Sequence, residues 1–411
     1  MSNLNARLSA LQKQVADAGL SGWLLYDFRG SNPLAHAALG LPPGAHLTRR
    51  WFCWVPDTGK PILLCSAIEA GTWRNLLGDT DIELRPCAGR AGLETALADC
   101  LTSGRVAMEY SPDGAVPYVG RVDAGTVEWV RSLGVEVVSS GDLFLESLRW
   151  NDEDLAAHRR SADGLMRAKD AAFQLIHERL QAGLPVEELT VQETIGRVLT
   201  EAGLIFDHPA IVAFAGHAAD PHYAPNPAGN AVLQAGQCVL LDLWAQEEGR
   251  PYADVTWMGV AGQPDAELLR AWEAARDARD VALSFLAEDY PGAEGWQADR
   301  IARDLLAARG FDDTVFIHRL GHDIGRVPGA LHGAGTNLDD FETHDTRRLT
   351  PGLATSIEPG VYLPAQNIGV RTEINVYYHA DRAEATTPIQ RDLYVLGVGD
   401  FADVHRRALG E

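Results

Sequence analysis

The stretch CVLLDLWAQEEGRPYADVTW, residues 238–257, decides how the second half of the chain folds. Apolar and polar residues alternate on both sides of residues 247–249, a pattern typical of two antiparallel strands joined by a short loop with Gly249 in the left-handed conformation. In a three-residue loop, the register places Asp242 opposite Asp254, with their β-carbons about 5 Å apart on one face. Like charges in that arrangement repel each other unless a cation lies between them. The hairpin therefore predicts a metal site, and the alternative is that one carboxylate points to solvent at the rim of the sheet.

The composition is that of an acidic globular protein. The chain has 411 residues, 46% of them hydrophobic and 22% charged, which is long enough for two domains with cores of their own. A net charge of −22 disfavours nucleic acid and anionic membrane surfaces as partners. The five cysteines are dispersed without CxxC spacing, and no apolar run resembles a signal peptide or a membrane span. We therefore expect a cytoplasmic protein.

Two domains are predicted, at residues 1–148 and 149–411. In the first, strand patterns alternate with helical patterns, which indicates a small α/β domain. Asn151 follows the junction as the expected N-cap of a long helix that runs to about residue 181. Further helices are expected at residues 190–202, 265–287 and 296–309. The last hundred residues are rich in strand patterns, glycine and proline, so the whole chain is assigned to the α/β (α+β) class.

Two histidine motifs flank the hairpin in the sequence. His222 lies in a proline-rich loop, where a lone histidine usually has a structural role. In FIHRLGHDIG (316–325), His318 and His322 are four residues apart, a spacing that fits one face of a helix. The glycines on either side of His322 instead favour a loop or strand that approaches a ligand closely.

Two glutamates follow in segments with the pattern of strands. Glu358 in ATSIEPGVYL (354–363) precedes a proline and is therefore expected in extended backbone. IGVRTEINVYY (368–378) predicts a single strand with Arg371 and Glu373 on one face. Each acid alone is compatible with surface exposure. Together with the two aspartates and the glycine-flanked histidine, they indicate a buried site.

The order and surroundings of these residues resemble the pita-bread metallopeptidases, which include methionine aminopeptidase, aminopeptidase P and prolidase. The motifs that carry the resemblance are PHY around His222, LLD and ADVT around the two aspartates, GHDIG, SIEPGVY and GVRTE. The resemblance implies a pita-bread catalytic domain at residues 149–411, and it implies that residues 1–148 form the amino-terminal domain of the prolidase, aminopeptidase P and creatinase branch. The metal ligands implied by the resemblance are Asp242, Asp254, His322, Glu358 and Glu373.

These ligands suit two divalent metal ions per subunit, with Mn²⁺ favoured by the oxygen-rich set and Co²⁺ or Zn²⁺ as alternatives. The resemblance also implies that a hydroxide bridging the ions hydrolyses the amide bond and that Glu358 transfers the proton to the leaving nitrogen. It implies that His222 and His332 contact the substrate around the scissile bond, with His318 as a support. His332 departs from the family pattern: it lies ten positions after His322 rather than about seven, and Gly333 follows it where the family commonly has glutamate. A longer intervening loop is therefore expected.

The expected reaction is the cleavage of short proline-containing peptides, namely Xaa-Pro dipeptides. The resemblance alone also implies that the protein is a homodimer. Selection for a dipeptide requires a cation for the free carboxylate. The candidates are Arg371 and, from the amino-terminal domain, Arg29 and Arg49-Arg50, with Tyr26 and Asp27 beside Arg29 able to cap a pocket. The alternative is that Arg29 pairs with Asp27 at the surface and that Tyr26 belongs to the core.

Three other functions stay open at this point. A non-catalytic binding module on the same fold would be expected to have lost metal ligands. Aminopeptidase P, which acts on longer peptides, shares the fold and the metal ligands. A creatinase-like hydrolase would use no metal and should lack several of the ligands, whereas this chain has all five.

Overall fold

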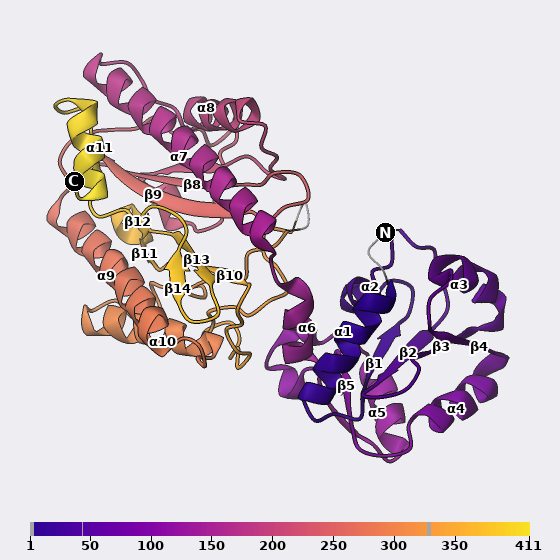
Figure 1. Cartoon of the computed structure of the whole chain (residues 1–411). Coiled ribbons are helices and arrows are strands. Elements are labelled where there is room, and N and C mark those ends of the chain that lie inside the picture. Colours follow the sequence, from indigo (N-terminus) through magenta and orange to yellow (C-terminus); the bar gives the residue numbers. More distant parts are fainter. Residues whose placement is uncertain (1–3, 43, 327–329) are drawn as a thin grey trace. The chain divides into compact units, whose positions relative to one another are not determined.

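The computed structural model describes residues 4–42, 44–326 and 330–411. The chain divides into two compact units, Met1–Leu148 and Arg149–Glu411 (Figure 1). This division falls at the residue where the sequence pattern places the domain junction. Among the helices that the structure describes, none is both long and apolar enough to cross a lipid bilayer.

The first unit is built on a mixed six-stranded sheet with the order β4-β3-β2-β1-β5-β6. Its strands are β1 (Gly22–Asp27), β2 (Trp51–Pro56), β3 (Ile62–Ser66), β4 (Glu83–Cys87), β5 (Arg105–Met108) and β6 (Glu136–Ser139). Its helices are α1 (Leu4–Asp17), α2 (Pro33–Leu39), α3 (Ala70–Leu77), α4 (Gly89–Cys100), α5 (Ala124–Ser132) and α6 (Gly141–Leu148). One face of the sheet forms a core with α4 and α5 that includes Leu24, Phe52, Leu97, Val106 and Val130.

The second unit begins with the predicted long helix. Its helices are α7 (Asp152–Gln181), α8 (Glu188–Glu201), α9 (Ala266–Asp289), α10 (Gly295–Ala308) and α11 (Phe401–Leu409). Asn151 caps α7 as expected: its side chain accepts from the amide of Asp154, 2.9 Å away, and the Asp154 carboxylate accepts from the Asn151 amide. This reciprocal capping box satisfies two amides that an uncapped helix start would leave unpaired.

The second unit contains a four-stranded sheet with the order β15-β9-β8-β7. Its strands are β7 (Ile211–Phe214), β8 (Cys238–Ala245), β9 (Ala253–Ala261) and β15 (Tyr394–Leu396). Helices α7, α8 and α11 share one core with this sheet (Figure 1). Odd-numbered residues of β8 and β9, such as Leu241, Val255 and Trp257, belong to that core. Because side chains alternate along a strand, Asp242 and Asp254 face the opposite side.

A second group of strands lies beside α9 (Figure 1). These strands are β10 (Ala354–Ile357), β11 (Gly360–Leu363), β12 (Ile368–Arg371), β13 (Ile374–Tyr378) and β14 (Ala383–Ala385). β10 and β14 each pair with β13 in one sheet, whereas β11 pairs with β12 in another. The prediction of one strand over residues 368–378 is therefore wrong, because pairing is interrupted at Thr372 and Glu373. The short 3-10 helices are η1 (Ala67–Glu69), η2 (Pro112–Gly114), η3 (Pro117–Val119), η4 (Ala215–Ala219) and η5 (Pro364–Gln366).

The β8–β9 hairpin forms with a different register from the predicted one. Asp242 lies opposite Thr256, and Asp254 lies opposite Trp244, so the two aspartates are diagonal neighbours. The connection covers residues 246–252 instead of three residues, although Gly249 has the expected positive φ of 73°. The register differs by two residues. Both aspartates consequently remain on the same face.

Candidate active site

The two glutamates are positioned by an interruption in an antiparallel ladder. Ile357 pairs with Ile374 before the interruption, and Gly360 pairs with Arg371 after it, so one register continues across the gap and places Glu358 opposite Glu373. Pro359 has no amide hydrogen to donate to the ladder, which explains the break. The free amides bond elsewhere: Glu358 N donates to Leu320 O (2.7 Å), and Glu373 N donates to Thr256 O (3.1 Å). Each glutamate is thereby fixed to a neighbouring segment.

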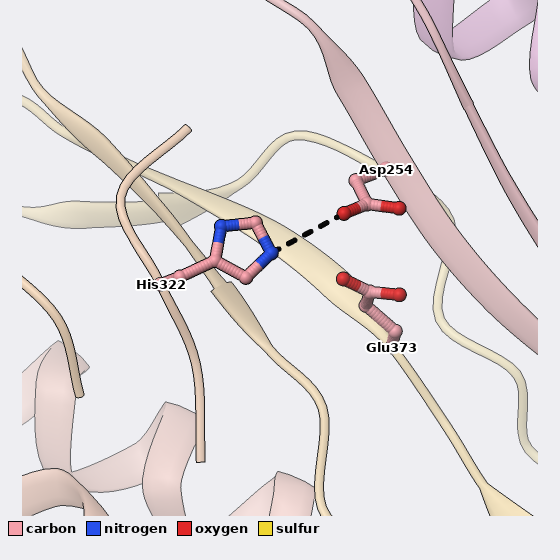
Figure 2. Close-up of side chains that lie close together, drawn as sticks. All are labelled: Asp254, His322 and Glu373. Atoms are coloured by element: carbon pink, nitrogen blue, oxygen red, sulfur yellow. Dashed lines mark ion pairs between the residues drawn. The ribbon is translucent and has the colours of Figure 1, made fainter. Parts of the chain in front are cut away.

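Asp254, His322 and Glu373 form the centre of the site (Figure 2). One ligand atom from each lies within 4.8 Å of the others, and all three residues are buried. His322 lies in a loop and not on a helix, as its flanking glycines indicated. The loop passes close to β10 at Gly321. A β-carbon at this position would lie 2.1 Å from Ser356 O, so only glycine allows the loop to come this close to β10. The amide of His322 also donates to Ser356 Oγ (2.9 Å).

The His322 ring is oriented as a metal ligand. Its Nδ1 lies 3.0 Å from Asp323 O, and a carbonyl can only accept, so Nδ1 carries the proton. Burial lowers the pKa of His322 well below its usual value, and the charges of His332 and Arg319 lower it further. The neutral ring therefore directs the Nε2 lone pair at Asp254 Oδ2 (3.4 Å) and Glu358 Oε1 (3.5 Å). Acceptors that face one another in this way need a cation or a proton between them.

The carboxylates carry the signature of a metal site. Asp254 Oδ1 and Glu373 Oε1 are buried and have no hydrogen-bond partner among the described residues. Burial raises the pKa of Asp254 well above its usual value, and the charges of Asp242 and Glu358 raise it further. Burial likewise raises the pKa of Glu373, and the charge of Asp254 raises it further. The unpaired oxygens and the mutual repulsion show that these residues fit divalent cations, which would relieve both.

Asp242 and Glu358 complete the predicted set at the same place. Both line one cavity of about 820 Å³ together with Asp254, His322 and Glu373. Burial raises the pKa of Glu358 to about 7, while Arg371 and Arg319 oppose the shift. Ser356 Oγ donates to Glu358 Oε1 over 3.0 Å. The structure thus brings all five predicted ligands together.

Arg371 lies in this cavity but its nitrogens donate to the protein. Nη2 donates to Asp242 Oδ2 (2.5 Å), Nε to Thr256 Oγ1 (3.1 Å), and Nη1 to Tyr362 Oη (3.2 Å) and to a main-chain carbonyl. Arg371 is therefore the charge partner of Asp242. Its predicted role in binding a substrate carboxylate stays a prediction.

The three other predicted histidines also line the cavity. His222 and His332 are exposed to it, whereas His318 is held by two contacts. His318 Nδ1 donates to Arg319 O (2.8 Å), and Nε2 accepts from Tyr362 Oη (2.7 Å). Burial, followed by the charge of Arg371, lowers the pKa of His318 to about 3, so this histidine is neutral.

The described residues on either side of the loop expected before His332 pair with each other. Gly325 N donates to Leu331 O (2.7 Å) and Gly333 N donates to Asp323 O (2.9 Å), so His332 returns beside His322. The two rings lie 3.9 Å apart between centroids. Residues 327–329, within the expected longer loop, lie outside the described residues.

Several residues of the site were not predicted from the sequence. Arg319, Trp244 and Asp207 line the cavity. Tyr362 Oη accepts a hydrogen bond from Arg371, and Thr256 Oγ1 donates one to Glu373. Their contacts link segments far apart in the chain, which alternation and spacing do not reveal. The signal for Arg319 was its place between His318 and His322 in HRLGH.

The predicted substrate-binding residues of the amino-terminal unit have local roles there. Asp27 is buried, and its carboxylate accepts from the amides of Gly30 (2.9 Å) and Asn32 (2.8 Å). Tyr26 is 3% exposed and donates to Asp123 Oδ2 (3.1 Å), as the core alternative expected. Arg29 is exposed, with a positive φ of 60°. Arg50 lines a separate small cavity with Asp123.

Solved structures with this fold are metallopeptidases of the pita-bread class. Dipeptidase PepE from Mycobacterium ulcerans is 22% identical with a TM-score of 0.65, and the match covers 97% of this chain and 99% of that one. A variant of Escherichia coli aminopeptidase P is 16% identical with a TM-score of 0.57, over 99% and 98% of the two chains. The predicted fold class is confirmed.

Residues 157–380 match metallopeptidase family M24, and the chain belongs to this family. An Xaa-Pro dipeptidase of Lactobacillus delbrueckii subsp. lactis is 30% identical over 234 residues. That match spans 56% of this chain and 58% of the relative, less than two thirds of its length. The resemblance drawn from the motifs is confirmed.

Proposed function

We propose that the protein is a dinuclear-metal Xaa-Pro dipeptidase. The observation that carries the metal requirement is the His322 Nε2 lone pair, which faces two carboxylate oxygens at 3.4 and 3.5 Å. The relative named as an Xaa-Pro dipeptidase supports the substrate class. The cavity of about 820 Å³ is within the range of small-molecule sites.

The residues that would hold two divalent ions, with Mn²⁺ favoured, are Asp242, Asp254, His322, Glu358 and Glu373. When bound, such ions lower the pKa of a water that attacks the scissile carbonyl and polarise that carbonyl. Glu358 is the carboxyl group proposed to take up a proton from the attacking water and deliver it to the leaving prolyl nitrogen. Its bond from Ser356 Oγ orients one oxygen of the carboxylate. His222 and His332 border the space where the substrate binds.

Dipeptides and longer peptides are distinguished by one comparison. The purified protein is depleted of metal with a chelator, reloaded with Mn²⁺, and assayed with Ala-Pro and Ala-Pro-Ala. We expect rapid hydrolysis of Ala-Pro, little cleavage of Ala-Pro-Ala, and no turnover by the metal-free protein. Comparable cleavage of both would assign the protein to aminopeptidase P, and full turnover without metal would refute the mechanism.

Two variants make the assay specific for the site. His322→Ala removes a ligand and should lower kcat by orders of magnitude. Arg197→Gln is a matched control, because Arg197 pairs only with Glu201 on the exposed side of α8 among the contacts described. It should retain the activity of the unmodified protein.

A further inference from the structure

We infer that Arg319 is a positioning residue that fixes the tautomer of His332, so that the ring offers an Nε2–H to the substrate. The inference rests on the proposed function for its catalytic meaning. Its structural part, the tautomer, is independent of the substrate. Arg319 lies between His318 and His322 in the sequence and on the wall of the same cavity.

The contact that carries the inference joins Arg319 Nη2 to His332 Nδ1 over 2.9 Å. A guanidinium has five N–H donors, no acceptor, and does not lose its proton in proteins. Nδ1 must therefore contribute a lone pair, and the single ring proton of neutral His332 must lie on Nε2. A doubly protonated ring would set two donors and two positive charges against each other.

Arg319 is itself held in place. Its guanidinium lies 3.7 Å from the Glu342 carboxylate, and its main-chain N donates to the same carboxylate over 3.4 Å. Its carbonyl accepts from His318 Nδ1 at 2.8 Å. The side chain is only 11% exposed, so the acid and the neighbouring histidine together orient the arginine toward His332.

The histidines of the cavity consequently differ in tautomer. His318 and His322 each give Nδ1–H to a carbonyl, which leaves Nε2 as an acceptor or a metal ligand. His332 has the reverse arrangement. Of these three rings, His332 is the one that donates through Nε2. A neutral donor of this kind stabilises negative charge that develops on a carbonyl oxygen during hydrolysis.

The tautomer is measured by NMR of ring nitrogens in ¹⁵N-histidine-labelled protein loaded with Zn²⁺, which is diamagnetic. The His332 signals are identified by their loss in His332→Gln. We expect Nε2 of His332 to be protonated and Nδ1 to be unprotonated. Arg319→Met should give a mixture of tautomers, whereas Arg319→Lys, which can only donate, should restore the original one.

Kinetics with Ala-Pro give the second readout. Loss of an outer partner of this kind typically costs 10- to 100-fold, so we expect Arg319→Met to lower kcat by about that factor with little change in KM. Arg319→Lys should recover most of the loss, and Arg197→Met serves as the control.

The inference is overturned if His332 of the unmodified protein carries its proton on Nδ1 or is doubly protonated. It is equally overturned if Arg319→Met keeps both the tautomer and the kcat. Failure of the unmodified protein to cleave any Xaa-Pro peptide would refute the proposed function alone, because the NMR measurement does not depend on turnover.

Discussion

Arg371 and Asp242 form a buried ion pair at the edge of the ligand cluster, with Nη2 and Oδ2 2.5 Å apart. The pair brings a fixed positive charge to a group of four carboxylates. Burial raises the pKa of Asp242, and the charge of Arg371 opposes that shift. Arg371 therefore compensates part of the negative charge that the site carries before metal binds.

Arg371→Met tests this compensation. Removal of one member of a buried ion pair typically costs about 3–5 kcal/mol, because the remaining charge is left unpaired. We expect the free energy of unfolding of the metal-free protein to fall by that order, with a smaller loss once Mn²⁺ is bound. Urea unfolding of both forms measures the difference. Arg197→Met, at an exposed pair, should cost less than about 1 kcal/mol. Equal losses at the two positions would contradict the assignment.

Asp254→Asn should separate stability from activity. The substitution removes a buried charge whose pKa is raised by burial and by Asp242 and Glu358, so the metal-free variant should melt at a higher temperature than the unmodified protein. The same change removes a metal ligand, and kcat should drop by orders of magnitude. Calorimetry of the metal-free proteins checks the first expectation. A lower melting temperature of the variant would show that repulsion at Asp254 is not the dominant effect.

The stability of the metal-free protein should depend on pH through Glu358. Burial raises the pKa of this group from 4.5 to about 7, so the folded state binds its proton more tightly than the unfolded state. The resulting stabilisation is complete below about pH 4.5 and is lost as pH rises to about 7, a change of about 3 kcal/mol. Glu358→Gln should lack this contribution. The measurement is the difference in unfolding free energy between the two proteins at pH 4.5 and pH 7.5.

Bound metal should reverse this trend, because divalent ions bind the deprotonated carboxylates. In the presence of Mn²⁺ we expect the unmodified protein to gain stability as pH rises through the same range. A metal-loaded protein with the pH profile of the metal-free one would indicate that Glu358 is not a ligand.

We also expect a homodimer, on the basis of resemblance to the prolidase branch. Light scattering at micromolar concentration should give about twice the chain mass of 44.5 kDa. A mass equal to that of one chain would exclude the dimer under those conditions.

The five site residues could be singled out from the sequence because each lies in a local pattern, and their role as metal ligands was implied by the family resemblance. Alternation placed Asp242 and Asp254 on one face, and this survived a register error of two residues because the period of a strand is also two. The error arose from loop length. Residues 246–252 contain no signal strong enough to show that the strands stop before Gln246 and restart after Tyr252.

The interruption between β12 and β13 could not be predicted from the sequence, for a different reason. Residues 368–378 alternate regularly, but the segment opposite contains Pro359, and the ladder breaks in both partners at that level. Alternation within one segment does not report a proline in its partner. The Arg319–His332 contact could not be predicted either, because a hydrogen bond between a loop residue and a distant ring produces no periodic pattern in the sequence.

The opposed positions of Glu358 and Glu373 restrict how the length of this hairpin can vary. One residue inserted in β11 or β12 would shift the pairing by one and turn a glutamate to the other side of the ladder. Residues 364–367 at the tip, where Asn367 has a positive φ of 56°, lie outside the paired strands. A change in length at this tip would leave Glu358 opposite Glu373, whereas a one-residue change within either strand would not.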